Sequence, residues 1–222
     1  MRKWILCAGL LALMPAALSA HYIWLEYDNG DEARVYFGEI QDGEREVSPG
    51  KLDKIKGLKI FTADKGGTAK EVASKKTKTH FSATGVKNPE FVVASALDVP
   101  VTDMKKYNWG MVKPNYYARF GSRAVPGAKP VTTLDILPGN APNEIQVYFR
   151  GKALEGEKVM LYAPNTWMKE YKTDKAGKIK IDTPWNGQYV IEVIHTEKTP
   201  GKFEDKDYES VRHRATYTFI KK

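Results

Sequence analysis

The chain has 222 residues and a formal net charge of +8, with basic and acidic residues interspersed and no basic helix or base-stacking motif, so nucleic acid is not an expected partner. Its one cysteine, Cys7, lies close to the N-terminus, which leaves the remainder without a disulfide, a thiolate nucleophile or a cysteine metal site. Beyond residue 20 no stretch approaches the roughly 18 apolar residues of a membrane span.

Residues 1–20 have the pattern of an export signal. A short basic start precedes a mostly apolar stretch, residues 4–13, whose length is within the roughly 7–15 residues of a signal and too short to span a bilayer. Small residues then lead to a cleavage site after Ala20 or, one position earlier, after Ser19. We therefore predict an exported, periplasmic protein, and cleavage after Ala20 makes His21 its first residue.

Short apolar or alternating runs, separated by Gly, Pro, Asn and Asp, recur from residue 22 onward and are typical of β-strands. In the first half of the chain the predicted strands are residues 22–27, 33–38, 58–62, 77–83, 90–97 and 116–120. A short helix is predicted to start near Ser48 and Pro49. We expect residues 21–128 to form an N-terminal β-sandwich domain.

A stretch rich in proline and glycine, residues 121–144, follows, and we place a domain boundary near residue 128. The predicted strands of the second half are residues 132–136, 144–148, 158–163, 168–173, 178–182, 187–196 and 211–220. Seven short strands in roughly 90–100 residues are typical of an immunoglobulin-like sandwich. The predicted fold class is therefore all-β, with two immunoglobulin-like β-sandwich domains in tandem, the second covering residues 129–222.

Two histidines lie at matching ends of the last two long predicted strands. His195 ends one strand, His213 begins the next, and each lies on the more apolar face of its strand. If the strands pair antiparallel, the two Cβ atoms lie about 4.5–5.5 Å apart, within reach of one metal ion whose bonds to nitrogen are about 2.0–2.1 Å long. The alternative, and the commoner arrangement, is a pair of partly buried histidines hydrogen-bonded to backbone at a sandwich rim.

His21 adds a second reason to consider a metal. An N-terminal histidine can chelate a metal through its α-amine and ring Nδ1, and both kinds of group can lose their protons near neutral pH. A further imidazole from His195 or His213 gives a nitrogen site whose geometry favours Cu(II) or Ni(II) over zinc. Cleavage after Ser19 would supply the amine of Ala20 and the amide of His21 instead, which favours the same metals. The alternative is that His21 is only the residue at which the signal ends.

His80 has a different setting from the other three histidines. It shares the face of its predicted strand with Lys78, Ser82 and Thr84, so we expect a solvated edge residue. Whether it takes part in a metal site is left open. The predicted metal ligands are therefore His21, His195 and His213. Because the sequence has no nucleophile elbow, HExxH, P-loop or GxGxxG, we predict no catalytic residues.

Several segments carry a resemblance to a known family: "AHYIWLE", "VYFGEIQDGEREVSPGKLD", "PNYYARFG", "TDKAGKIKI" and "IEVIHTEKTPG…YESVRHRATYTF". Together they resemble the periplasmic, NikM-like proteins of nickel/cobalt uptake systems. The resemblance implies an exported protein of two immunoglobulin-like domains, the second of the carboxypeptidase-regulatory type, that handles a transition metal. We expect this divalent metal ion to be nickel, cobalt or copper. It also implies that His21, His195 and His213 match histidines of the family, and that the partner is a membrane metal permease or an outer-membrane receptor.

Three functions are compatible with these features. The first is a periplasmic metal carrier or an accessory of metal uptake, which is not an enzyme. The second is a copper-dependent oxidative enzyme with a histidine-brace site, of the kind that polysaccharide monooxygenases use. The third is a metal-free module that binds a partner protein or a glycan.

Overall fold

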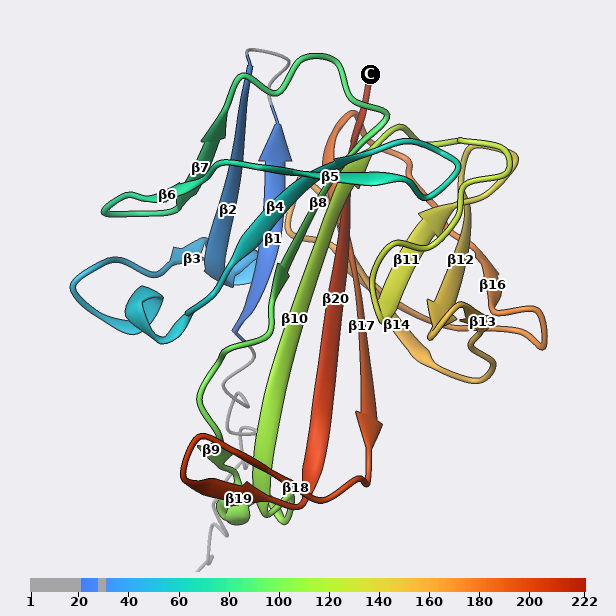
Figure 1. Ribbon diagram of the computed structural model, residues 1–222. Helices are drawn as coiled ribbons and strands as arrows, with labels where there is room; N and C mark the ends of the chain where they lie inside the picture. Colours follow the sequence, from blue (N-terminus) through green and yellow to red (C-terminus); the bar gives the residue numbers. More distant parts are fainter. Residues whose placement is uncertain (1–20, 28–30) are drawn as a thin grey trace, which may run out of the picture.

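The computed structural model describes residues 21–27 and 31–222 (Figure 1). Over this part of the chain the regular elements are twenty strands and three short 3-10 helices, which confirms the all-β fold class. None of these helices is long and apolar enough to cross a membrane. The predicted export signal, residues 1–20, lies outside the described residues.

One nine-stranded sheet runs through the whole molecule. Its main path follows the order β15-β14-β17-β20-β10-β8-β4-β5, and β9 pairs with the outer part of β10. The strands are β4 (Lys59–Ala63), β5 (Ala69–Val72), β8 (Phe91–Ala96), β9 (Thr102–Asp103), β10 (Met111–Gly121), β14 (Lys158–Tyr162), β15 (Met168–Lys172), β17 (Gly187–Glu197) and β20 (Ser210–Lys221). The two halves of the chain meet where β10 and β20 pair in parallel, whereas the other strand pairs are antiparallel.

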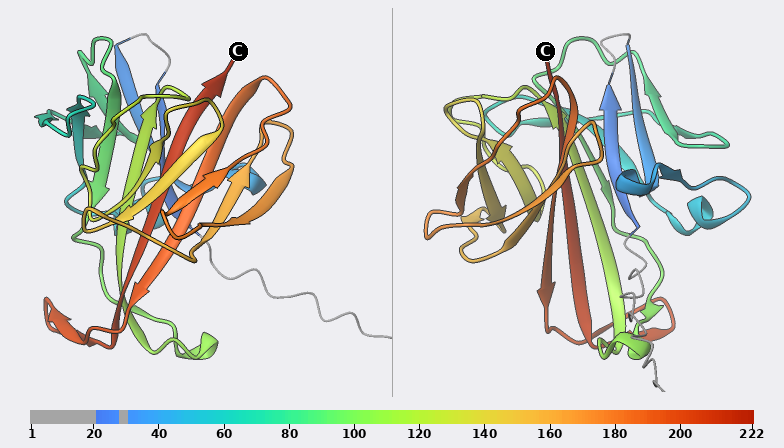
Figure 2. Two further views of the ribbon diagram at one scale, coloured as in Figure 1. Left: turned by 90° about the vertical axis from the view of Figure 1, so that its right-hand side faces the viewer. Right: turned by 180° about the vertical axis from the view of Figure 1, so that it is seen from behind.

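Two smaller sheets cover this central sheet on opposite faces (Figures 1 and 2). The first cover sheet contains β1 (Tyr22–Tyr27), β2 (Glu32–Glu39), β3 (Glu44–Arg45), β6 (Lys75–Lys76) and β7 (Phe81–Thr84). The second contains β11 (Leu134–Pro138), β12 (Glu144–Phe149), β13 (Lys152–Ala153) and β16 (Lys178–Lys180). Side chains of β10 alternate between the two cores: Tyr116 and Ala118 pack toward the first cover sheet, and Tyr117 packs toward the second.

The segment at the predicted domain boundary is part of the packed structure. Val125, Ala128 and Val131 pack against buried residues of β4 and β8. The halves 21–128 and 129–222 therefore share a sheet and a covered surface, and do not each have a complete set of their own sheets. The immunoglobulin-like type of the two sandwiches stays a prediction.

Most predicted strands coincide with observed ones, and residues 22–27 match β1 end to end. The strand predicted at residues 77–83 begins later, at Phe81, and the predicted helix is the 3-10 turn η2 (Lys51–Lys54). The remaining elements are η1 (Ile40–Asp42), η3 (Lys105–Tyr107), β18 (Gly201–Phe203) and β19 (Lys206–Tyr208). The last two form a hairpin within the stretch predicted as the loop between His195 and His213.

Candidate metal centre

The backbone of the first cover sheet brings His21 beside a group of carboxylates. β1 pairs antiparallel with β2 from Tyr22 opposite Gly38, so the preceding residue, His21, lies alongside Glu39. The chain then turns through η1 and returns as β3, with Glu44 opposite Glu39. The residue after β3, Glu46, is held by a 2.8 Å bond from its amide nitrogen to the carbonyl oxygen of Phe37.

Gly38 allows this close return of the chain. A Cβ atom at this position would lie 2.0 Å from the carbonyl oxygen of Glu44, which is far inside van der Waals contact. Any larger residue would therefore push β3 away from β2. Because β3 leads directly into Glu46, the absence of a side chain at Gly38 helps to place both Glu44 and Glu46 beside His21.

The side chain of His21 is 9% exposed and is contacted at both ring nitrogens. Nδ1 lies 3.0 Å from Oε1 of Glu39, and Nε2 contacts Oε1 of Glu46 and lies 3.7 Å from Oε2 of Glu44. One ligand atom each from His21, Glu44 and Glu46 lies within 4.8 Å of the other two, as a shared cation requires. The ring also packs against Phe37, with centroids 5.3 Å apart.

Lys51, from η2, closes the group from the solvent side. Its Nζ lies 3.2 Å from Nε2 of His21, 2.6 Å from Oε1 of Glu46 and 3.5 Å from Oε1 of Glu44. The bond to Glu46 raises the pKa of Lys51. Burial raises the pKa of Glu46, but the bonds from Lys51 and His21 outweigh it, so the pKa is lowered overall. The ammonium group of Lys51 therefore occupies the position at which these three ligands converge.

A buried ion pair holds His21 from the other side. Nη1 of Arg214, in β20, donates a 3.1 Å bond to the carbonyl oxygen of His21. The Nε of Arg214 donates to Glu192 of β17, which also accepts a 2.6 Å bond from the hydroxyl of Tyr162. Arg214 and Glu192 are almost completely buried. The backbone at His21 is thereby fixed to the middle of the central sheet.

The other two predicted ligands form a cross-strand pair. β17 and β20 pair antiparallel with His195 directly opposite His213, as predicted. Both nitrogens of His213 have protein partners, the Tyr117 hydroxyl at 3.0 Å and Glu197 at 2.9 Å. Burial lowers the pKa of His213, against the effect of Glu197. Nδ1 of His195 lies 2.6 Å from Glu157.

The structure does not bring His21 together with His195 and His213. Successive residues of a strand point to opposite faces of its sheet. Arg214 contacts His21 on the face covered by the first cover sheet, whereas His213 packs against Phe149 of the second cover sheet, with ring centroids 5.2 Å apart. The predicted meeting of all three histidines is thus replaced by two separate groups, and a ligand role for His195 and His213 stays a prediction.

His80 is not the solvated residue that its strand face suggested. Its side chain is only 18% exposed, because the ring packs against Tyr36 with centroids 5.3 Å apart. Oγ1 of Thr79 lies 2.9 Å from Nδ1, and a carboxylate oxygen of Glu32 lies 3.8 Å from Nε2. Burial lowers the pKa of His80.

The carboxylates around His21 were not identified from the sequence. Glu44 and Glu46 are two residues apart, a spacing that places two side chains on one side of an extended chain. This was the available signal. Their approach to His21, and that of Glu39 and Lys51, depends on the β2–β3 return, which the sequence pattern does not display.

Comparison with known proteins adds no identification. No family model matches the chain, and no curated protein matches it. The resemblance to NikM-like proteins therefore depends on short segments of the sequence alone.

Proposed function

We propose that the protein binds a divalent transition metal ion at His21, Glu44 and Glu46, and that it serves as a carrier or accessory in the uptake of nickel, cobalt or copper. The observation that carries this proposal is the convergence of one imidazole nitrogen and two carboxylates within 4.8 Å of one another. Imidazole suits nickel, copper and zinc, and carboxylates suit harder cations, so a mixed set fits a borderline divalent metal.

The geometry favours coordination through Nε2 of His21. A metal-bound histidine usually donates its other ring N–H to a carboxylate or carbonyl, which fixes the orientation of the ring. Glu39 is placed to accept that bond from Nδ1 at 3.0 Å. A chelate through the α-amine and Nδ1 would have to break this contact. Coordination through Nε2 therefore differs from the terminal chelate that the sequence suggested, and the two can be separated by experiment.

We expect the chain without residues 1–20 to bind one Ni(II) per molecule in isothermal titration calorimetry. Glu46→Gln should weaken this binding at least about 100-fold, because loss of a ligand should exceed the 10–100-fold effect of losing an orienting partner. The matched control is Glu71→Gln, an exposed glutamate of β5 paired with Lys59. Equal affinities in the three proteins, or no binding of Ni(II), Co(II) or Cu(II), would contradict the proposal.

One additional residue before His21 decides between the two modes of coordination. If the metal is held by Nε2, adding a methionine before His21 leaves the affinity within about threefold, which corresponds to less than about 1 kcal/mol. If the amine and Nδ1 form the chelate, the same addition removes a ligand and the affinity falls sharply. A sharp fall would therefore overturn coordination through Nε2 while leaving metal binding itself in place.

Lys51 should compete with the metal. Its half-exposed side chain can turn outward, but the ion pair with Glu46 must first be broken. We expect Lys51→Met to tighten Ni(II) binding about two- to fivefold, because exposed ion pairs are worth about 0.2–1 kcal/mol. Lys54→Met, in the same turn, is the control in the same titration. Unchanged or weaker binding in the Lys51 variant would show that the ammonium does not occupy the cation position.

A further inference from the structure

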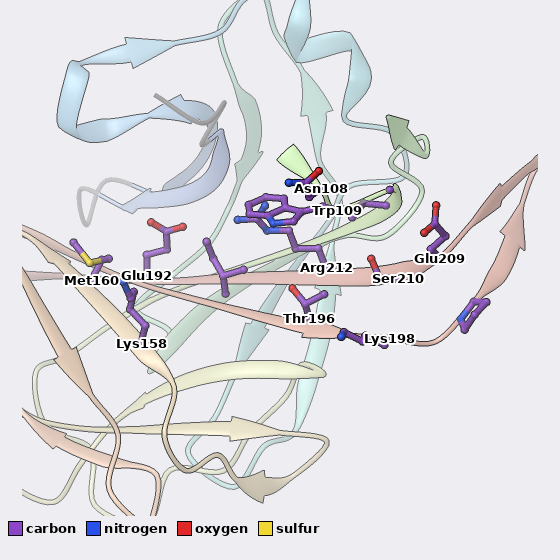
Figure 3. A pocket seen from close by; sticks show the side chains of 14 residues that line it. Asn108, Trp109, Lys158, Met160, Glu192, Thr196, Lys198, Glu209, Ser210 and Arg212 are labelled. Atoms are coloured by element: carbon purple, nitrogen blue, oxygen red, sulfur yellow. The ribbon is translucent and has the colours of Figure 1, made fainter. Parts of the chain in front are cut away.

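A groove that is separate from the metal centre lies on the same face of the central sheet as β1. It is a groove of about 700 Å³ with a floor from β14, β17 and β20 and a wall from the turn before β10 (Figure 3). Its volume is within the range of about 300–1,000 Å³ that is usual for small-molecule sites. His21, Glu44 and Glu46 do not line it, so its ligand need not be the metal.

The distinctive residue of this groove is Arg212. Its guanidinium carbon lies 4.1 Å from the ring centroid of Trp109, which forms part of the wall. Within the described part of the chain Arg212 forms no ion pair and no side-chain hydrogen bond, and the charge of Glu192 acts on it only from a greater distance. Burial, with Arg214 beside it, lowers the pKa of Arg212 to about 10, so it remains a cation at neutral pH. An unpaired, half-buried cation is costly, and an anion in the groove would offset this cost.

Two carboxylates, Glu192 and Glu209, also line the groove, and each has another hydrogen-bond partner. Glu192 is bonded to Arg214 and Tyr162, as described above, and Glu209 accepts a 3.1 Å bond from the amide nitrogen of Met111.

The groove also contains two lysines. Lys158 pairs with Glu170 at 2.8 Å, whereas no described residue pairs with Lys198. Thr196, directly opposite Arg212 in the β17–β20 pair, adds a hydroxyl to the same part of the floor. Arg212, Lys198 and Thr196 thus form a cationic, hydrogen-bonding end of the groove.

The rest of the lining is mixed: Glu192, Ser210 and Asn108 are polar, and the other members include several apolar side chains. The apolar surface comes from Met160, Ile194, Trp109 and Pro200. Figure 3 shows Met160 and Trp109 at the groove. An inorganic anion would pair with Arg212 but leave these apolar side chains exposed to water. A ligand with a flat or apolar body would bury them while its charged group met Arg212. A guanidinium binds a carboxylate through two parallel N–H donors, which also fixes the direction of the ligand.

We propose that this groove binds a small organic carboxylate with an aromatic or apolar body, its carboxylate on Arg212 and its body against Trp109 and Ile194. The site goes beyond metal binding and does not depend on it. Lys198 contributes a second positive charge at the carboxylate end. The groove thus recognises a ligand in which a carboxylate is attached to an apolar body.

The test is a calorimetric titration of the metal-free protein with 2-naphthoate, with its uncharged analogue 2-naphthamide, and with inorganic phosphate. We expect saturable binding of naphthoate, and binding at least about tenfold weaker for the other two, because the amide lacks the charge and phosphate lacks the body. Arg212→Gln should weaken naphthoate at least about tenfold, and Arg212→Lys less. Trp109→Leu should weaken naphthoate without changing phosphate.

Arg150→Gln is the control, because Arg150 is an exposed arginine outside the groove. Thermal unfolding of each variant establishes that the fold is retained. Absence of naphthoate binding, equal binding of naphthamide, or unchanged binding in Arg212→Gln would each overturn the proposal. If phosphate bound as tightly as naphthoate, the claim that the ligand has an apolar body would be overturned. The Ni(II) titration of the Trp109→Leu variant is expected to be unchanged, because Trp109 does not line the cavity that contains His21. Failure of one proposal therefore leaves the other testable.

Discussion

Replacing Asp135 by leucine is expected to lower the free energy of unfolding by about 3–5 kcal/mol, the effect of leaving a buried charge without its partner. Asp135 of β11 accepts bonds of 2.9 Å and 2.6 Å from Nε and Nη2 of Arg119 in β10, and both side chains are almost fully buried. It also accepts the backbone N–H groups of Val131 and Ile136, at 2.8 Å and 3.0 Å. The measurement is equilibrium unfolding in urea.

Two further variants and one control separate the contribution of the ion pair from that of the backbone hydrogen bonds. Arg119→Met should cost less than Asp135→Leu, because the carboxylate keeps its backbone donors. The double variant should recover only part of the loss, since the backbone N–H groups near residue 131 stay unpaired. Glu71→Gln, which breaks an exposed pair, should change stability by less than about 1 kcal/mol. A loss below 1 kcal/mol for Asp135→Leu would show that this ion pair does not hold the second cover sheet to the central sheet.

The second large effect is expected at Glu192. Glu192→Leu leaves Arg214 buried without a counter-charge and removes the acceptor of the Tyr162 hydroxyl. We again expect a loss of about 3–5 kcal/mol in the free energy of unfolding, measured in urea. This substitution also disturbs the group that donates to the carbonyl of His21.

The double variant Glu192→Leu/Arg214→Met tests the two roles of this pair separately. It should recover part of the stability, because both charges are gone while the Tyr162 hydroxyl stays without its acceptor. It should not recover full Ni(II) affinity, because the His21 carbonyl has lost its donor. Full stability with full affinity would mean that Arg214 does not position the metal centre, and no recovery of stability would mean that packing, not charge, explains the loss.

Local patterns were sufficient for much of the fold. The short apolar runs in residues 22–27 and 187–196 predicted β1 and most of β17, because a strand that is covered on both faces has apolar residues at nearly every position. The antiparallel pairing of His195 with His213 followed from strand ends that lie close in sequence. Such features depend on neighbours along the chain, which the sequence displays directly.

The arrangement of the sheets depends on contacts that the sequence does not display. Nothing local indicates that β10 pairs in parallel with β20, or that β1 docks on the face that carries Arg214 while His213 faces the other way. That choice of face separates His21 from the histidine pair. The carboxylate group around His21 was missed for a similar reason, because it depends on the η1 turn and on the close packing at Gly38.

The position of β20 at the centre of the main sheet has a consequence for how the protein folds. Tyr117 and His213, partners across β10 and β20, are 96 positions apart in sequence. Closing so large a loop loses chain entropy before any contact compensates it, so high contact order predicts slow folding. Until β20 arrives, β10 and β17 each present an open edge to other chains. Truncation within β20 should therefore promote aggregation of both halves together, not leave one half intact.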